Sequence, residues 1–155
     1  MLDELPATEP VIRIATPSDI DIINELDSYS TSPNRNIHRE MEKYFGSVDP
    51  STHDRTLIFL LEIEGKAAAK AELMLPPRDS TLSVGYIKRV VVNPEYRKMG
   101  LARKLLEHII SWAQNEYPLS ALDLHVWEQN TPAIRLYEAL GFQLQHRELY
   151  FRLLL

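Results

Sequence analysis

The chain has no cysteine among its 155 residues, which excludes disulfides, thiolate metal ligands and a cysteine nucleophile. It also has no apolar run of about 18 residues, the length that a membrane-spanning helix requires. Residues 1–30 lack the basic start and apolar stretch of a signal peptide. These absences predict a cytoplasmic protein that has no membrane partner.

Positive charge is in the minority, because 17 Lys and Arg stand against 22 Asp and Glu and give a formal net charge of −5. A broad nucleic-acid surface needs a basic excess, so we expect no nucleic-acid partner. The five histidines show no His-x-x-x-His spacing, and we therefore expect no metal site. The length predicts a single domain over residues 1–155.

Hydrophobic periodicity and turn residues predict a mixed α/β fold. The predicted strands cover residues 11–15, 57–63, 67–75, 83–92 and 121–127, with a final pair at 142–144 and 148–154. The predicted helices cover residues 17–28, 37–45, 100–116 and 131–140. This order predicts a mixed sheet with helices on its faces.

The most informative segment is residues 90–103, where a run of valines stops at Asn93-Pro94, a basic turn follows, and Gly100 opens an apolar-periodic helix. The first turn of a helix carries unpaired N–H groups and the positive end of the helix dipole. Glycine lets an anion approach that backbone closely. The segment therefore predicts a phosphate site, and the alternative is a plain strand–turn–helix in which Gly100 only relieves a tight turn.

Two motifs stand in order along the chain. The first is Arg97-Lys98-Met99-Gly100-Leu101-Ala102, between a strand and a helix, and the second comprises Asn130, Ala133, Leu136-Tyr137 and Gly141-Phe142. With these motifs the chain resembles the GCN5-related N-acetyltransferase (GNAT) superfamily over nearly its whole length. The resemblance implies a mostly antiparallel mixed sheet, about four flanking helices and a V-shaped cleft for acetyl-CoA.

The resemblance also implies how acetyl-CoA would be held. Backbone groups of the valine strand would pair with the pantetheine arm as a neighbouring strand does, N–H groups of the basic turn and helix start would hold the pyrophosphate, and Asn130 would bond the pantetheine from the other side. The alternative for Asn130 is a loop asparagine before a helix. The implied cofactor-binding residues are Val90, Val91, Val92, Arg97, Lys98, Met99, Gly100, Leu101, Ala102, Arg103 and Asn130.

Acetyl transfer from a thioester to an amine needs a base, an oxyanion donor and an acid for the departing thiolate. Deprotonating an alkyl ammonium of pKa about 10.4 costs about 4.6 kcal/mol at pH 7, and a strand N–H near Val91 could meet the oxyanion. Tyr137 is the candidate acid, since a phenol stays protonated at neutral pH and can donate to a thiolate. Its alternative role is to pack a helix against the sheet.

The candidate base is His125. Many superfamily members carry a glutamate six residues before the position of Val92, but Tyr86 stands there. Others carry one twelve residues before the tyrosine, where this chain has His125, and imidazoles titrate near neutral pH. A strand histidine held by a backbone partner is the alternative, and Glu128, Glu72 or a water relay are further candidates.

The main functional hypothesis is an acetyl-CoA-dependent N-acetyltransferase that modifies a primary amine of a small molecule or of a protein or peptide N-terminus. The alternative is an acyl-CoA-binding regulatory or sensory module without turnover. A nucleotide-binding reading is weakened because Gly100 is not followed by the Lys-Ser/Thr pair of a phosphate-binding loop. The resemblance places residues 35–42 on the acceptor side, and a homodimer is left open.

Overall fold

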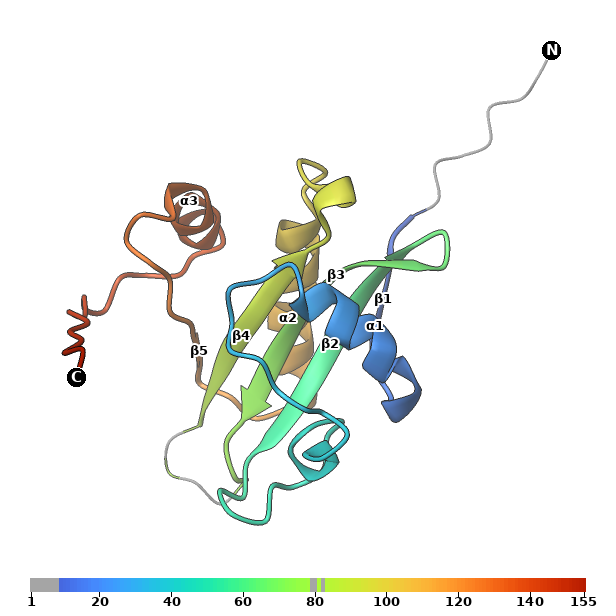
Figure 1. Ribbon diagram of the computed structural model, residues 1–155, viewed down its shortest axis with the longest axis horizontal. Helices are drawn as coiled ribbons and strands as arrows, with labels where there is room; N and C mark the ends of the chain where they lie inside the picture. Colours follow the sequence, from blue (N-terminus) through green and yellow to red (C-terminus); the bar gives the residue numbers. More distant parts are fainter. Residues whose placement is uncertain (1–8, 79–80, 82) are drawn as a thin grey trace. The chain divides into compact units, whose positions relative to one another are not determined.

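The computed structural model describes residues 9–78, 81 and 83–155. These residues form two compact units, of which the first ends at His125 and the second spans Val126–Leu155. The first unit is built on a five-stranded sheet in the order β1-β2-β3-β4-β5 (Figure 1). The strands are β1 (Val11–Ile14), β2 (Arg55–Ile63), β3 (Lys66–Leu75), β4 (Val84–Val92) and β5 (Ala121–Asp123). Neighbours among β1 to β4 are antiparallel, and β5 is parallel to β4.

One face of this sheet is covered by α1 (Ile20–Asp27). Its buried residues Ile20, Ile23 and Leu26 recur at helical spacing and pack with Ile58 and Leu60 of β2. The buried stripe confirms the helix that the sequence predicts after Thr16-Pro17.

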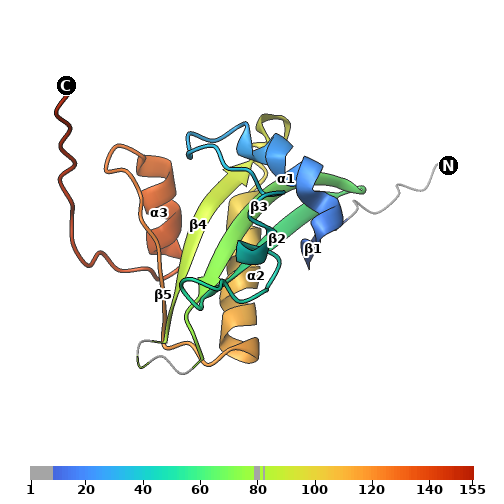
Figure 2. The same cartoon turned by 60° about the horizontal axis from the view of Figure 1, so that its bottom comes forward.

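The opposite face is covered by α2 (Leu101–Glu116). Side chains alternate between the two faces of a strand, so Phe59, which lies between Ile58 and Leu60 in β2, points away from α1. Its ring packs edge to face against Trp112 of α2, with the ring centroids 5.7 Å apart. Leu105, Leu106 and Ile109 are fully buried along the same helix. Figure 2 shows α1 and α2 on opposite sides of β2 and β3.

The helix predicted over residues 37–45 is wrong. Only a short 3₁₀ turn, η2 (Met41–Lys43), forms in that segment. The segment buries Ile37 and Tyr44 but no continuous apolar stripe. Without such a stripe, tertiary packing cannot offset the cost of nucleating a helix.

The second unit contains α3 (Thr131–Ala139). The helix ends as predicted at Gly141, whose φ of +100° lies in the left-handed region. The final strand pair predicted at 142–144 and 148–154 is not formed, because neither segment pairs with the other as a ladder and no strand is assigned over residues 142–155. A strand needs a partner for its backbone groups. For the same reason β5 stops at Asp123, where its pairing with β4 ends, instead of reaching Trp127.

None of the helices in the described part of the chain combines the length and apolarity needed to cross a bilayer.

Candidate active site

The strands β4 and β5 share only a short ladder. Val84–Tyr86 pair with Ala121–Asp123, and within the described residues the register gives β4 no partner strand on that side from residue 87 to residue 92. In an antiparallel ladder, the N–H groups of successive residues point alternately toward the neighbouring strand and away from it. The Asn93 N–H donates to the Ala68 carbonyl of β3 at 2.8 Å, so the N–H of Val91 also faces β3 and that of Val92 faces the open edge. Beyond Tyr86, β4 can therefore pair with an extended amide-containing ligand.

The chain turns sharply where β4 ends. The Asn93 side chain accepts a hydrogen bond from the Glu95 N–H at 3.0 Å within a 3₁₀ turn, η3 (Pro94–Tyr96). Lys98 and Gly100 then adopt left-handed φ values of +65° and +71° before α2 begins. A Cβ on Gly100 would meet no atom within 4 Å, so this backbone faces open space. The structure thus confirms the predicted strand–turn–helix and leaves its N–H groups approachable.

Positive charge gathers at this turn. The side chains of Arg97 and Lys98 are exposed, as is Met99 at 52%. Arg103 is also exposed and forms a pair with Glu107 of the next helical turn, with Nε 2.8 Å from Oε1. Leu101 is buried and anchors the start of α2 in the core. The arrangement suits a small polyanion above the helix start, and the pyrophosphate contacts stay a prediction.

The two positions at which superfamily members carry a catalytic glutamate meet in space. Tyr86 on β4 and His125, just after β5, are joined by a hydrogen bond of 2.5 Å between the phenolic oxygen and Nδ1. Their rings are 5.4 Å apart between centroids. A phenol in contact with an imidazole can relay a proton. The sequence named both positions but not their contact.

Glu72, considered as a base from sequence, is fully buried on β3. Both of its oxygens accept hydrogen bonds from Arg35, and Oε2 also accepts one from Lys70 at 2.7 Å. Burial by itself raises the pKa of the Glu72 carboxyl, but these two cations outweigh burial and lower the pKa below its usual value. A carboxylate held in this way is a poor proton acceptor.

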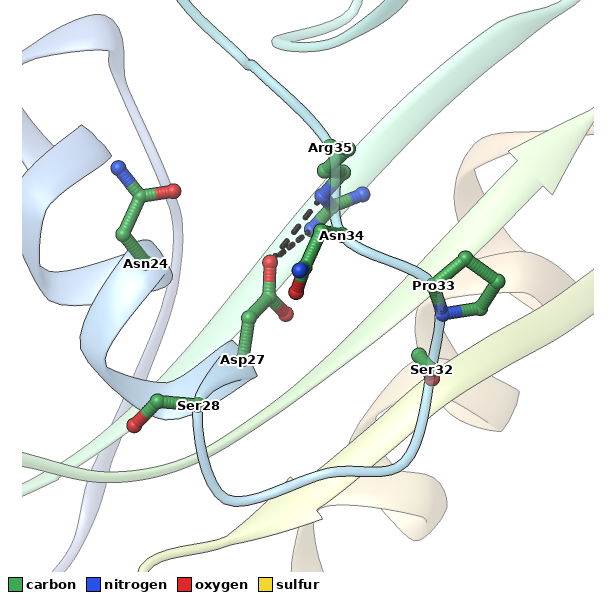
Figure 3. Close-up of a pocket in the computed structure, with 7 residues that line it drawn as sticks. All are labelled: Asn24, Asp27, Ser28, Ser32, Pro33, Asn34 and Arg35. Carbon is green, nitrogen blue, oxygen red and sulfur yellow. Dashed lines mark hydrogen bonds and ion pairs between the residues drawn. The ribbon is translucent and has the colours of Figure 1, made fainter.

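A polar cavity of about 220 Å³ lies between the end of α1 and the following loop (Figure 3). Asp27 and Arg35 both line it and contact each other directly, with Arg35 Nε donating to Asp27 Oδ2 at 3.1 Å. The cavity borders the segment that the resemblance places on the acceptor side. Its remaining lining residues are Asn24, Ser28, Ser32, Pro33 and Asn34.

The second unit carries the other predicted site residues. The Asn130 side chain accepts a hydrogen bond from the Ala133 N–H at 3.3 Å and so caps α3. Its contact with pantetheine stays a prediction.

Tyr137 packs edge to face with Phe142, with their ring centroids 6.0 Å apart. Burial raises the pKa of the Tyr137 phenol, which keeps it protonated as an acid must be. Glu128 is exposed, with Oε1 3.5 Å from Arg147 Nε.

The sequence alone does not predict that two charged side chains are buried on β3. Lys70 and Glu72 are both fully buried and, being two residues apart on a strand, share one face. Two opposite charges at this spacing inside an alanine-rich strand were the available signal. Their partners, Asp27 and Arg35, come from α1 and the loop after it, and no local pattern connects them to β3.

The open edge of β4 and the strand–turn–helix that follows it belong to a fold that the comparisons identify by family. The acetyltransferase (GNAT) family model matches residues 21–142. The chain belongs to the GNAT family.

Two relatives and one solved structure illustrate the similarity. The chain is 38% identical over 101 residues to the ribosomal protein bS18-alanine N-acetyltransferase of Escherichia coli strain K12, covering 65% of this chain and 62% of the relative. It is 30% identical over 164 residues to N-alpha-acetyltransferase 60 of Xenopus tropicalis, covering 96% of this chain and 66% of the relative. The structure of AAC(6′)-Iy in complex with a CoA bisubstrate analogue superposes with a TM-score of 0.72 at 17% identity, covering 96% of this chain and all of that one. The match spans about three fifths of the length of the first relative.

Proposed function

We propose that the chain is an acetyl-CoA-dependent N-acetyltransferase. The observation that carries the proposal is the edge of β4 beyond Tyr86, which has no partner strand in the part of the chain that the structure describes and leads directly into the exposed backbone turn before α2. A strand edge offers alternating N–H and C=O groups to the amides of pantetheine. A helix start flanked by Arg97 and Lys98 offers donors and charge to a pyrophosphate. The two lie in the order in which they occur along CoA.

The acceptor that we propose is the α-amine of a protein or peptide N-terminus. An α-amine has a pKa of about 7.7 to 8.0, so its deprotonation costs only about 1 kcal/mol at pH 7, against about 4.6 kcal/mol for an alkyl amine. The Tyr86–His125 pair offers an imidazole, and not a buried carboxylate, as the base. An imidazole suits an α-amine because that amine loses its proton at a smaller free-energy cost than an alkyl amine does. The relatives named as bS18-alanine N-acetyltransferase and N-alpha-acetyltransferase 60 support the same acceptor class.

In this mechanism the proton of the amine passes to the imidazole of His125, directly or through the Tyr86 hydroxyl. The neutral amine attacks the thioester carbonyl, and the oxyanion accepts a hydrogen bond from a backbone N–H on the open edge of β4. As the C–S bond breaks, Tyr137 donates its phenolic proton to the departing CoA thiolate, and the extra proton on the nitrogen of the new amide returns to the Tyr137 phenolate through solvent. An expected contribution of about 10²- to 10⁴-fold from the base makes His125 and Tyr86 the residues to test.

The test is a panel of amines with acetyl-CoA, read by the mass of the acetylated product. It compares peptides that have a free α-amine and no lysine, peptides that have a blocked N-terminus and one lysine, and small alkyl amines. Acetylation of the free α-amine peptides is the expected result. Acetylation of alkyl amines alone contradicts the acceptor class, and acetyl-CoA binding without any product favours the acyl-CoA-binding module instead.

A further inference from the structure

β4 contains a bulge directly before the valines of the proposed cofactor edge. Lys70 of β3 pairs with Val91 and Glu72 pairs with Lys88, so one residue of β3 faces both Arg89 and Val90. Arg89 has a φ of +52°, in the left-handed region that a residue with a Cβ rarely occupies. A bulge of this kind disturbs the ladder and redirects the backbone groups around it.

The carbonyl of the bulged residue finds its partner in a buried cation. The ammonium of Lys70 donates to the Arg89 oxygen at 3.3 Å, although the Lys70 side chain is completely buried. A buried ammonium requires compensating charge. Glu72 supplies one carboxylate, with Oε2 2.7 Å from Nζ, and Asp27 supplies another, with Oδ1 2.8 Å from Nζ as an ion pair rather than an aligned hydrogen bond.

The cluster of Asp27, Arg35, Lys70 and Glu72 is balanced, with two positive and two negative side chains. It joins α1 and the loop after it to the sheet at the bulge. The Arg89 side chain makes a second connection there, because its guanidinium donates to the Pro33 carbonyl at 3.0 Å. The strained backbone at Arg89 is therefore held at its carbonyl by Lys70 and at its side chain by the loop, as residues in rare conformations require.

We propose that Lys70 is a positioning residue for acetyl transfer, and that its buried ammonium fixes the β4 bulge so that the outward-facing backbone donor at Val92 is aligned with the thioester. This inference rests on the proposed function. Lys70 itself does not touch the reacting atoms. Its effect passes through the Arg89 carbonyl, and the loop that follows α1 is tied to the same point.

The test needs a variant that removes the ammonium without leaving an unpaired buried charge, which would prevent folding. The double variant Lys70→Met with Glu72→Gln leaves the Arg35–Asp27 pair balanced. Asp19→Asn is the matched control, because it breaks an ion pair between buried Asp19 and partly exposed Arg13 at the other end of α1, away from the β4 bulge.

The first readout is amide hydrogen exchange in β4, which requires no turnover. We expect faster exchange at residues 88–92 in the double variant, unchanged exchange in the middle of β2, and no β4 effect in Asp19→Asn. The second readout is kcat with the acceptor found by the amine panel. We expect kcat to fall about 10- to 100-fold in the double variant while the Kd for acetyl-CoA changes only a few-fold.

Two results overturn the inference: unchanged β4 exchange in a folded double variant, or a loss of kcat that Asp19→Asn reproduces. Failure of the proposed function has a different signature, since wild-type protein would then acetylate no amine while the exchange readout still reports whether Lys70 holds the bulge.

Discussion

The phenolic oxygen of Tyr86 lies 2.5 Å from Nδ1 of His125. Tyr86 comes from β4, where it pairs with Asp123 in the parallel ladder, and His125 follows that ladder by two residues. The short parallel pairing of β4 and β5 thus brings together two residues that lie 39 positions apart. The contact places an imidazole beside β4, a strand that carries no carboxylate.

We expect His125→Ala to lower kcat about 10²- to 10⁴-fold and to leave acetyl-CoA affinity nearly unchanged. Tyr86→Phe, which keeps the ring and removes only the hydroxyl, should lower kcat by a smaller factor. The measurement is kcat against pH for each variant. The wild-type profile should contain an ionisation that the His125→Ala profile lacks. Wild-type kinetics in both variants would assign the proton to water or to Glu128.

Tyr137→Phe should lower kcat and kcat/KM about equally, because thiolate charge develops only after the ground state. The Phe142 contact needs the ring and not the hydroxyl, so the thermal midpoint should barely change. Steady-state kinetics and thermal unfolding of the same preparation check this. If the variant acetylates the acceptor at the wild-type rate, Tyr137 is a packing residue and the acid is another group.

Acetyl-CoA should stabilise the protein by about 2.7 kcal/mol at 100 times its Kd, measured by thermal unfolding with ATP and NAD in parallel. A shift with ATP or NAD and none with acetyl-CoA contradicts the proposed cofactor.

Gly100→Ala should weaken acetyl-CoA binding, since an added Cβ points into the open space that the pyrophosphate would enter. Gly65→Ala is the matched control, because Gly65 has a φ of +78° and equally open surroundings in the β2–β3 turn. Both substitutions should cost about 1 kcal/mol of stability from backbone strain. Titration calorimetry should show a raised Kd for Gly100→Ala only, and an equal change in both would remove the anion-site assignment.

Asp19→Asn should reduce stability in a pH-dependent way. A hydrogen bond from Arg13 lowers the pKa of the Asp19 carboxyl from 3.8 to about 2, against the opposing effect of burial. Because the folded-state pKa is the lower one, the stabilisation is present above about pH 4 and is lost as the pH falls toward 2. At pH 7 we expect a loss of about 1 kcal/mol, after allowance for solvent screening at partly exposed Arg13. Urea unfolding at pH 7 and pH 2.5 should show the difference between variant and wild type shrinking, and a constant difference would exclude the ion pair as its source.

Local patterns predicted those elements that bury a regular apolar stripe. The stripe of α2 and the proline start of α1 both appear in the structure, because helix periodicity and capping act within a few residues. The helix predicted at residues 37–45 does not form, since Ile37 and Tyr44 are buried without being part of such a stripe. The strands predicted at 142–144 and 148–154 failed for another reason, because a strand depends on a partner and not on its own residues.

The sequence by itself determined the strand–turn–helix of residues 90–103, because its signals are local: a valine run, Asn93-Pro94 and Gly100. Tertiary structure decided what lies around that motif. The contact of Tyr86 with His125 and the attachment of Lys70 to the Arg89 carbonyl join segments far apart in the chain. Such contacts depend on strand register and on burial of charge, and neither property is written in the neighbouring residues.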